Sequence, residues 1–289
     1  MLKTIHLTGK FHKGSPCVAL LGGFDGMHVG HKKLLEKAKT YGLPIGVMSL
    51  VGCKGNESLF TSEERANFFV GLGADFIFEA SFSQIKDRSA EEFLQTLEKE
   101  FSPKVFICGD DFRFGKDALG DTKWLKRATQ VSVQVEKLVK KNGEKVSATR
   151  IKSCLQQGDV KRANELLGER FFLIGEVFAE RQVGRTIGFP TANVLYPADK
   201  FALKKGVYET RVVINGVEYK GITNFGHRPT FENDDVLTET YLDGFDGDLY
   251  GKKIKISFVR YLREIKKFDD ATALKAQLTE DIRRVREND

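Results

Sequence analysis

Residues 18–31 read Val18-Ala19-Leu20-Leu21-Gly22-Gly23-Phe24-Asp25-Gly26-Met27-His28-Val29-Gly30-His31 and decide the fold of the first half of the chain. The stretch begins as a short apolar run, breaks at a pair of glycines, and continues into helical spacing over residues 29–39. A strand that passes through a glycine-rich turn into a helix is the unit from which parallel α/β sheets are built.

The same alternation of strand and helix extends outward from this stretch. Further apolar runs cover residues 45–51, 76–78 and 105–108, and helical spacings cover residues 62–72, 90–101 and 160–167. Strands and helices that alternate with short links predict a parallel sheet covered on both faces. We therefore expect residues 1–168 to form a three-layer α/β domain with its boundary near Gly168.

The pattern changes to short β-type runs after residue 168. Such runs cover residues 173–177, 206–214, 218–222, 237–242 and 253–259. Asn215-Gly216, a strong two-residue hairpin signal, lies between two of them. Regular short strands of this kind predict a closed antiparallel barrel or a sandwich. An amphipathic helix is expected over residues 270–286, so residues 169–289 form a mainly antiparallel β-barrel domain with a terminal helix.

Length and composition agree with two folded domains. The chain has 289 residues, of which 41% are hydrophobic and 30% are charged, and about 150 residues per domain is a common size. The net charge is 46 minus 40, or +6, with basic and acidic residues interleaved. That sign suits anionic small molecules, and it gives little support to a nucleic-acid partner.

The sequence favours a cytoplasmic location. No run approaches the roughly 18 apolar residues of a membrane span, and charged residues interrupt the first 14 positions, so a signal peptide is not expected. The four cysteines are far apart, which argues against a disulfide framework or a zinc ribbon. We expect no membrane or nucleic-acid partner, and a monomer or weak homo-oligomer.

The glycine-rich turn before residues 29–39 predicts a phosphate site. Glycines permit close approach of the backbone, and a helix start offers free N–H groups at the positive end of its dipole. His28 and His31 are three residues apart, so they can share one side of the helix start and donate to phosphate oxygens. The alternatives are a plain turn with one surface and one core histidine, or a metal site that needs further ligands.

Three motifs resemble those of a known family. The order Gly-x-Phe-Asp-Gly-x-His-x-Gly-His over residues 22–31 is similar to the nucleotide-binding signature of the bacterial bifunctional riboflavin kinase / FMN adenylyltransferase (FAD synthetase) family. Residues 109–115 (GDDFRFG) with Gly120, and residues 146–152 (VSATRIK) followed by Gly158-Asp159-Val160, also resemble that family. The resemblance implies a nucleotidyltransferase-type, Rossmann-like domain that transfers AMP from ATP to FMN with the help of Mg²⁺.

The resemblance also implies site residues in this domain. The catalytic residues would be His28 and His31. Residues that would bind ATP are Gly23, Phe24, Asp25, Gly26, Gly30, Thr149, Arg150 and Lys152. Residues that would bind flavin are Asp111, Phe112 and Arg113.

Two positions depart from the family pattern. Where the family usually has Thr-Phe-x-Pro-His-Pro, this chain reads Ser49-Leu50-Val51-Gly52-Cys53-Lys54, so the histidine and both prolines are missing. Lys152 stands where the third motif of the family has arginine, which replaces a bidentate fork by a point charge.

Residues 170–286 resemble the riboflavin kinase module of the same family, and residues 184–193 (GRTIGFPTAN) match most strongly. The module implies a six-stranded Greek-key barrel. By resemblance, the kinase would bind ATP through Gly184, Arg185, Gly188, Phe189 and Pro190. Thr191 and Asn193 would supply oxygen ligands to Mg²⁺, an ion that prefers such ligands.

Glu239 matches the general base of the kinase, which takes the proton of the riboflavin 5′-hydroxyl. Asn224 and Arg263 match flavin-binding positions, and His227 is expected to be a loop residue. Taken alone, Glu239 would be interpreted as a solvated residue on an outward strand face.

The sequence therefore predicts an enzyme that converts riboflavin and ATP into FMN, and FMN and ATP into FAD and pyrophosphate. One alternative keeps the kinase and makes residues 1–168 a nucleotide- or flavin-binding module with weak or lost transfer activity. Another is a non-catalytic flavin-sensing regulator.

Overall fold

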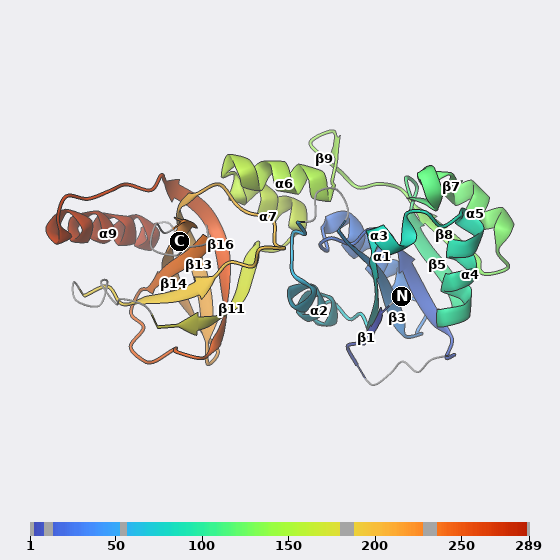
Figure 1. The fold of residues 1–289 in the computed structure, drawn as a ribbon, viewed down its shortest axis with the longest axis horizontal. Helices are drawn as coiled ribbons and strands as arrows, with labels where there is room; N and C mark the ends of the chain where they lie inside the picture. Colours follow the sequence, from blue (N-terminus) through green and yellow to red (C-terminus); the bar gives the residue numbers. More distant parts are fainter. Residues whose placement is uncertain (1–2, 9–13, 53–56, 180–187, 228–235, 288–289) are drawn as a thin grey trace. The chain divides into compact units, whose positions relative to one another are not determined.

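The structure is a computed structural model that describes residues 3–8, 14–52, 57–179, 188–227 and 236–287. The chain divides into two compact units, Met1–Ala148 and Thr149–Asp289 (Figure 1). Within the described ranges, no helix is both long enough and apolar enough to cross a membrane.

The first unit is built on one six-stranded sheet with the order β1-β4-β3-β2-β5-β8. Its strands are β1 (Lys3–His6), β2 (Cys17–Leu21), β3 (Ile45–Val51), β4 (Phe76–Ser81), β5 (Pro103–Gly109) and β8 (Ser132–Glu136). All neighbouring pairs are parallel except β1 with β4. The expected parallel sheet is confirmed, and the sequence analysis missed only strands at its two edges, β1 and β8.

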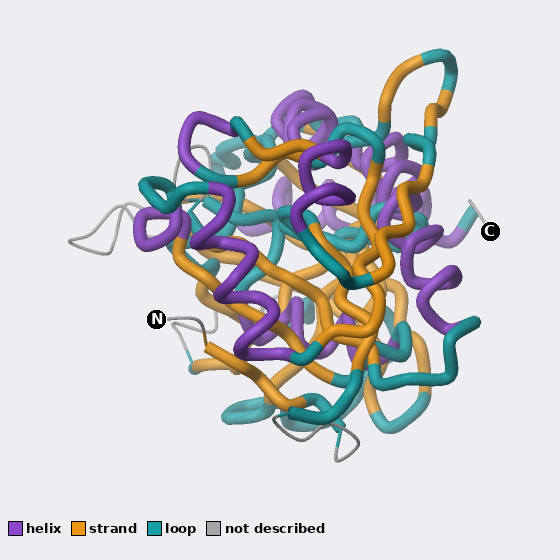
Figure 2. The backbone as a smooth tube through the Cα atoms, turned by 90° about the vertical axis from the view of Figure 1, so that its right-hand side faces the viewer, coloured by secondary structure: helices purple, strands orange, loops and turns teal. Residues whose placement is uncertain are grey.

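Helices lie on both sides of this sheet (Figure 2). They are α1 (Val29–Lys39), α2 (Ser62–Gly71), the single-turn α3 (Phe82–Ile85), α4 (Ala90–Phe101) and α5 (Thr122–Ala128). Capping boxes start α2 at Thr61 and α4 at Ser89, and each satisfies backbone N–H groups that a helix start leaves open. One face of the sheet packs with α4 and α5 in an apolar cluster that includes Phe76, Phe78 and Leu97.

Two small hairpins complete the first unit. The first pairs β6 (Arg113–Phe114) with β7 (Gly120–Asp121) around the 3₁₀ turn η1 (Lys116–Ala118). The second pairs β9 (Lys140–Lys141) with β10 (Glu144–Lys145), and it projects from the body of the unit (Figure 1).

The sheet reverses its order of growth beside β2. The chain adds β3 and then β4 on one side of β2, and it later places β5 on the other side. Ligands of open α/β sheets bind at such a switch point, outside the carboxyl ends of the strands. Leu21 lies opposite Cys108 in the β2–β5 pair, so the loops that follow these two strands emerge next to each other.

The second unit begins with two helices, α6 (Ala148–Gln157) and α7 (Val160–Leu167), and continues into a closed barrel. The barrel order is β11-β12-β15-β14-β13-β16. Its strands are β11 (Phe172–Phe178), β12 (Thr191–Leu195), β13 (Gly206–Ile214), β14 (Val217–His227), β15 (Val236–Leu242) and β16 (Lys253–Arg263). The order β16-β13-β14-β15 is the Greek-key arrangement, so the expected six-stranded barrel is confirmed.

The hairpin between β13 and β14 turns at Asn215 and Gly216, as expected. Both residues have positive φ angles, 51° and 82°, which a type I′ turn requires. The strand β12 was not expected, because its sequence was interpreted as part of a ligand-binding loop.

The division between the units falls at the first residue of α6, whereas the sequence places the boundary near Gly168. The reason is that α7 is fixed to the barrel by Asn164. Its Nδ2 donates to the carbonyl of Phe258 at 2.8 Å, and its Oδ1 accepts from the backbone N–H of Phe171 at 2.7 Å.

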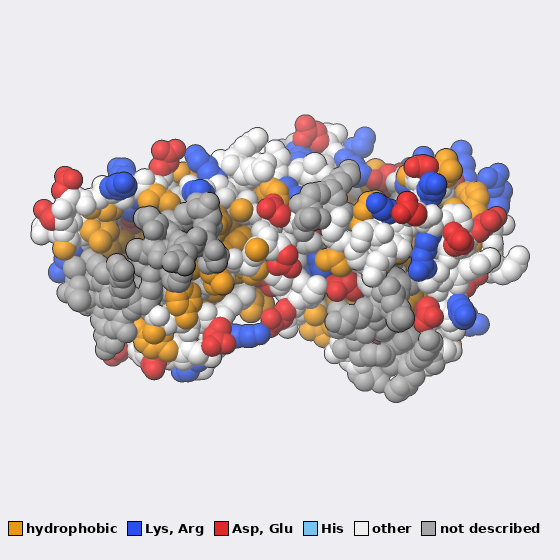
Figure 3. Space-filling view, in the orientation of Figure 1, with side chains coloured by type: hydrophobic (Ala, Val, Ile, Leu, Met, Phe, Trp, Pro, Cys, Tyr) orange, Lys and Arg blue, Asp and Glu red, His pale blue; other side chains and the backbone are white. Residues whose placement is uncertain are grey.

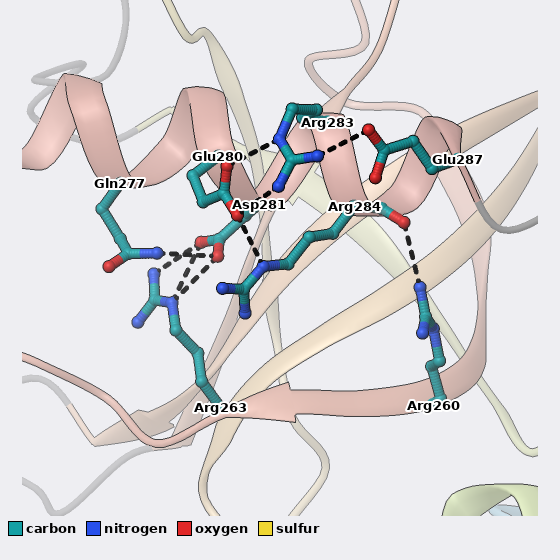
Figure 4. A network of polar contacts seen from close by, with 8 residues as sticks. All are labelled: Arg260, Arg263, Gln277, Glu280, Asp281, Arg283, Arg284 and Glu287. Atoms are coloured by element: carbon teal, nitrogen blue, oxygen red, sulfur yellow. Dashed lines mark hydrogen bonds and ion pairs between the residues drawn. The ribbon is translucent and has the colours of Figure 1, made fainter.

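The terminal helix α9 (Ala271–Arg286) is attached to β16 by a buried ion pair. Arg263 donates from Nε and Nη2 to both carboxylate oxygens of Asp281, at distances of 2.7 to 3.1 Å (Figure 4). Gln277 also donates to Asp281 at 3.0 Å, and Arg260 donates to the carbonyl of Arg284 at 3.2 Å. These bonds hold α9 against the side of the barrel.

Gly46 provides a test of packing in the first sheet. A Cβ atom at Gly46 would lie 2.4 Å from the ring of Phe76 and 2.8 Å from that of Phe78. We expect Gly46→Ala to destabilise the first unit by about 1–3 kcal/mol, because overpacking a core forces its neighbours to move. The measurement is guanidinium unfolding followed by fluorescence of Trp124, the single tryptophan, which lies in α5 of this unit.

The matched control is Gly71→Ala at the end of α2. A Cβ atom there meets nothing within 4 Å, and alanine favours the helix by roughly 0.5–1 kcal/mol over glycine. An unchanged midpoint for the Gly46 variant would contradict the packing argument.

Candidate functional site

The loop between β2 and α1 is shaped by close packing of its own residues. Phe24 is buried and has a φ angle of 38°, a conformation that non-glycine residues rarely adopt. Asp25 fixes the loop to the chain before α2, since its Oδ1 accepts the backbone N–H of Leu59 at 2.7 Å. Gly23 has nothing within 4 Å of a Cβ position, so the backbone there is open to a ligand.

The two histidines expected at the helix start lie in direct contact. His28 is the N-cap of α1, and its Nδ1 accepts the backbone N–H of His31 at 3.3 Å. The two rings are stacked, with centroids 3.7 Å apart and planes inclined by 14°. The ring of Phe24 lies on His31 with a centroid distance of 4.1 Å.

Gly30 has a packing reason in this motif. A Cβ atom at Gly30 would lie 3.1 Å from two atoms of the His28 ring, which is closer than side chains normally approach. The absence of a side chain at Gly30 therefore lets His28 fold over the helix start. Gly26 is similar, because a Cβ atom there would lie 3.2 Å from the ring of Phe60.

Both imidazoles are held neutral. Burial lowers the pKa of His31 from 6.5 to about 4, although the hydrogen bond to Gly26 and the charges of Asp111 and Asp25 act in the opposite direction. Burial also lowers the pKa of His28 well below 6.5, and the neighbouring His31 adds to that effect. The pair is a compact polar site that disfavours its own positive charge.

The loop after β5 brings a charged pair to the same place. Asp111 forms an ion pair with Lys145 of β10, and the charges of both residues act on His31. Asp110 fixes the segment that follows β8, since its Oδ1 accepts the backbone N–H of Leu138 at 3.1 Å. Sequence reasoning missed Lys145, and the signal available for it was a lysine directly before the third motif.

The remaining residues of the second motif have structural contacts. Phe112 is buried in the apolar cluster of the sheet, with its ring stacked on Phe114 at 5.2 Å. Arg113 pairs with Asp121 across the β6–β7 hairpin at 3.1 Å. A flavin-binding role of Asp111, Phe112 and Arg113 stays a prediction.

The third motif lies at the start of α6, in the second unit. Thr149, Arg150 and Lys152 are residues of this helix, and the Nζ of Lys152 lies 5.4 Å from the centroid of the Phe201 ring. Their ATP-binding role stays a prediction. Cys53 and Lys54, at the departure from the family pattern, lie outside the described residues.

Three polar side chains of the barrel form a row across neighbouring strands. Glu239 of β15 lies opposite Asn193 of β12 on one side and opposite Asn224 of β14 on the other. Asn224 donates from Nδ2 to Glu239 Oε2 at 2.9 Å. The Oδ1 of Asn224 is buried and has no hydrogen-bond partner among the described residues, so it is available to a ligand.

A second row of side chains lies two residues further along the same three strands, and it connects this site to α9. Thr191 lies opposite Tyr241, and Tyr241 lies opposite Ile222. Tyr241 packs against Phe189 with ring centroids 5.1 Å apart, and Ile222 belongs to the apolar cluster with Ile282 of α9. Because side chains alternate along a strand, Thr191, Asn193 and Glu239 share one face of the barrel.

A cavity of about 390 Å³ opens beside Thr191 and Asn193. Pro190 also lines it, and residues 245–250 close its other side. Its volume lies within the range of small-molecule sites. Gly188, two residues before Pro190, has a φ angle of 85°, whereas Gly184 and Arg185 lie outside the described residues.

Arg263 has a defined structural contact. Its guanidinium group pairs with Asp281 (Figure 4). Its Nη1 also donates to the carbonyl of Glu264 at 3.0 Å. The structure therefore gives Arg263 a role in holding α9, and its contact with flavin stays a prediction.

The folds and sites together define a two-unit enzyme: an α/β unit with a histidine pair at a helix start, and a β-barrel in which a carboxylate lies on the strand next to a cavity-lining strand. A family profile described as FAD synthetase matches residues 10–150, and one described as riboflavin kinase matches residues 167–288.

Curated relatives match nearly the whole chain. "Bifunctional riboflavin kinase/FMN adenylyltransferase" of Bacillus subtilis (strain 168) is 32% identical over 97% of this chain and 96% of its own length. The protein of that name from Pseudomonas fluorescens is 32% identical over 98% and 95%. The chain belongs to the bifunctional riboflavin kinase/FMN adenylyltransferase family.

A solved structure is similar to this chain over nearly its whole length. It is described as a macrolide-efflux protein from Streptococcus pneumoniae, is 28% identical, and covers 97% of both chains with a TM-score of 0.84. The likeness extends over both units.

The buried histidine pair predicts a loss of stability in acid. Both rings are neutral in the folded state and become protonated in the unfolded state below pH 6.5. The free energy of unfolding of the first unit should therefore fall as the pH decreases from 6.5 towards 4. The measurement is denaturant unfolding at pH 7 and pH 5, followed by Trp124 fluorescence.

His31→Gln removes one of the two titrating rings. The pKa of His31 changes from 6.5 to about 4 on folding. Between pH 7 and pH 5 we therefore expect the free energy of unfolding of the variant to fall by about 2 kcal/mol less than that of the parent protein. An equal loss in both proteins would show that His31 is not held neutral.

Proposed function

We propose that the barrel of the second unit phosphorylates riboflavin, and that the α/β unit transfers AMP from ATP to the resulting FMN, which gives FAD and pyrophosphate. The observation that carries this proposal is the row of Asn193, Glu239 and Asn224 on one barrel face, in which Asn193 also lines a cavity of about 390 Å³. Membership of the family agrees with both reactions.

Glu239 acts as the general base of the kinase step. The 5′-hydroxyl of riboflavin must lose a proton as its oxygen bonds to the γ-phosphorus of ATP and ADP departs. The hydrogen bond from Asn224 to Oε2 holds the carboxylate in one orientation. The free Oδ1 of Asn224 can accept a hydrogen bond from the flavin.

Thr191 and Asn193 fit a magnesium ion. A hydroxyl oxygen and an amide oxygen are hard, neutral ligands, and they lie two residues apart on the same face as Glu239. Mg²⁺ usually keeps several waters and phosphate oxygens beside one or two protein ligands. When bound, it would neutralise charge on the ATP phosphates, and ATP itself would occupy the adjoining cavity near Gly188, Phe189 and Pro190.

The adenylyl transfer needs a different set of groups. The nucleophile is the phosphate of FMN, which is already ionised near neutral pH, so the site has to hold two anions in line and neutralise the charge on the leaving pyrophosphate. The α1 helix start and Lys145 supply that positive potential, and the two histidines, which are neutral in the free protein, supply hydrogen-bonding groups.

Small molecules are the expected partners. On the face drawn in Figure 3, basic and acidic side chains of the described residues are interspersed, an arrangement that does not favour a polyanion such as nucleic acid. We propose that the protein acts in the cytoplasm, as a monomer or weak homo-oligomer, with ATP, riboflavin and FMN as substrates.

Substitution of Glu239 separates the two activities. We expect Glu239→Gln to reduce FMN formation from riboflavin at least 100-fold, since a general base contributes about 10²–10⁴ in rate, and to leave FAD formation from added FMN unchanged. Chromatographic separation of riboflavin, FMN and FAD over time measures both steps, and Glu176→Gln on the exposed part of β11 is the control.

The same assay tests the whole proposal in the parent protein. FMN that accumulates without any FAD, even when FMN is supplied, would indicate that the first unit binds ligand without transfer. Unchanged FMN formation by a folded Glu239→Gln protein would disprove the role of Glu239.

Lys145 is expected to contribute to ATP binding in the first unit. Lys145→Met should raise the KM for ATP in FAD formation roughly fivefold to tenfold, since a charged hydrogen bond contributes about 1 kcal/mol or more. FMN formation provides an internal control, because it occurs in the other unit. The matched variant Lys140→Met, on the exposed strand β9 of the same hairpin, should change neither KM, and an equal effect of both variants would contradict a specific role.

A further inference from the structure

Two hydrogen bonds give His28 and His31 opposite tautomers. The Nδ1 of His28 accepts the backbone N–H of His31, so that nitrogen carries a lone pair and the proton of the neutral ring lies on Nε2. The Nδ1 of His31 lies 2.7 Å from the carbonyl oxygen of Gly26. A carbonyl can only accept, so His31 carries its proton on Nδ1 and its Nε2 is a bare acceptor.

The two histidines therefore interact differently with an anion. A phosphate oxygen can accept a hydrogen bond from Nε2–H of His28, but it meets a lone pair at Nε2 of His31. His31 becomes a donor at that atom only if it gains a proton. The stacked rings, 3.7 Å apart, disfavour a second positive charge next to the first.

The surroundings decide which ring takes the proton. Asp25 of the β2–α1 loop and Asp111 after β5 favour charge on His31, whereas Lys145 of β10 opposes it. His28 has no such carboxylate among the groups that act on it. Its burial, His31 and Lys145 oppose its charge, and only a hydrogen bond to its own backbone favours it. Protonation of His28 at Nδ1 would also break the N-cap of α1.

We infer that His31 takes up one proton at Nε2 when the polyphosphate chain of ATP binds, while His28 stays neutral and donates from Nε2. This inference rests on the proposed adenylyl-transfer function of the first unit. The proton comes from solvent and returns to it when pyrophosphate leaves, and no bond of the nucleotide changes in this step. His31 thus supplies positive charge only in the presence of its anionic ligand.

The inference predicts a specific pH dependence. Because one proton binds together with ATP, the KM for ATP in FAD formation at saturating FMN should rise about tenfold per pH unit. The rise should extend up to the pKa that His31 has in the complex, and it is measured between pH 6.5 and 8.5, where the terminal phosphate of ATP is largely ionised. The KM for ATP in FMN formation serves as the internal reference.

His31→Gln is the informative variant. Its amide N–H can donate to phosphate without gaining a proton, so we expect FAD formation with a KM for ATP that varies less than twofold over the same range. A KM in the parent protein that does not rise with pH would overturn the inference, as would the same rise in His31→Gln.

A direct readout uses ¹⁵N-labelled histidine, of which the chain has five residues. In the flavin-free parent protein at pH 7, long-range ¹H–¹⁵N spectra should show His28 as the Nε2–H tautomer and His31 as the Nδ1–H tautomer. Addition of MgATP should convert His31, and not His28, to imidazolium. The variants His28→Asn and His31→Gln identify the two signals.

The spectra separate this inference from the proposed function. A His31 ring that stays neutral under saturating MgATP, in protein that still makes FAD from FMN, would overturn the inference and leave the function intact. Absence of FAD formation in the same protein would instead contradict the function.

Discussion

The parallel pairing of β2 with β5 is the constraint on which the first site depends. The pair sets Leu21 opposite Cys108, so that two loops far apart in the sequence leave the sheet at neighbouring points. One loop carries the histidine pair at the start of α1, and the other carries Asp111 with its partner Lys145. Without this crossover the start of α1 would lack the charged neighbours Asp111 and Lys145. With it, charged groups of both signs adjust the protonation of the histidines.

Register has the corresponding role in the barrel. Asn193, Glu239 and Asn224 come from three strands, and they meet because antiparallel pairing sets each directly opposite the next. A slip of one residue in β15 would turn Glu239 to the other face and bring Thr238 or Thr240 into the row. The helix α9 stabilises the same face, since Ile282 packs in the cluster that holds Ile222 and Phe189, and the Arg263–Asp281 pair fixes that helix.

Local patterns in the sequence were sufficient for most of the fold. Helix α1 is predicted over residues 29–39 and occurs there, and the Asn215-Gly216 signal gives the hairpin that the structure has. Strand β8, with a half-buried alternating sequence at the sheet edge, and β12, inside a motif interpreted as a loop, were missed because their β character depends on their partners. Likewise, spacing indicated that His28 and His31 lie together, but the contact of Lys145 with Asp111 depends on a hairpin whose docking no local pattern encodes.

The difference between the two sites follows from their nucleophiles. A phosphate nucleophile is ionised before it binds, so a site that joins it to ATP has to oppose repulsion between anions and needs no base. The first site accordingly offers imidazoles, a helix start and a lysine. A hydroxyl nucleophile is neutral and must lose a proton as it reacts, so the site proposed for it needs a carboxylate held in place. Asn224 donates such a positioning hydrogen bond to Glu239, the base that we propose. In a chain that carries out both reactions, the side chains that each unit requires depend on whether its nucleophile still carries a proton when it binds.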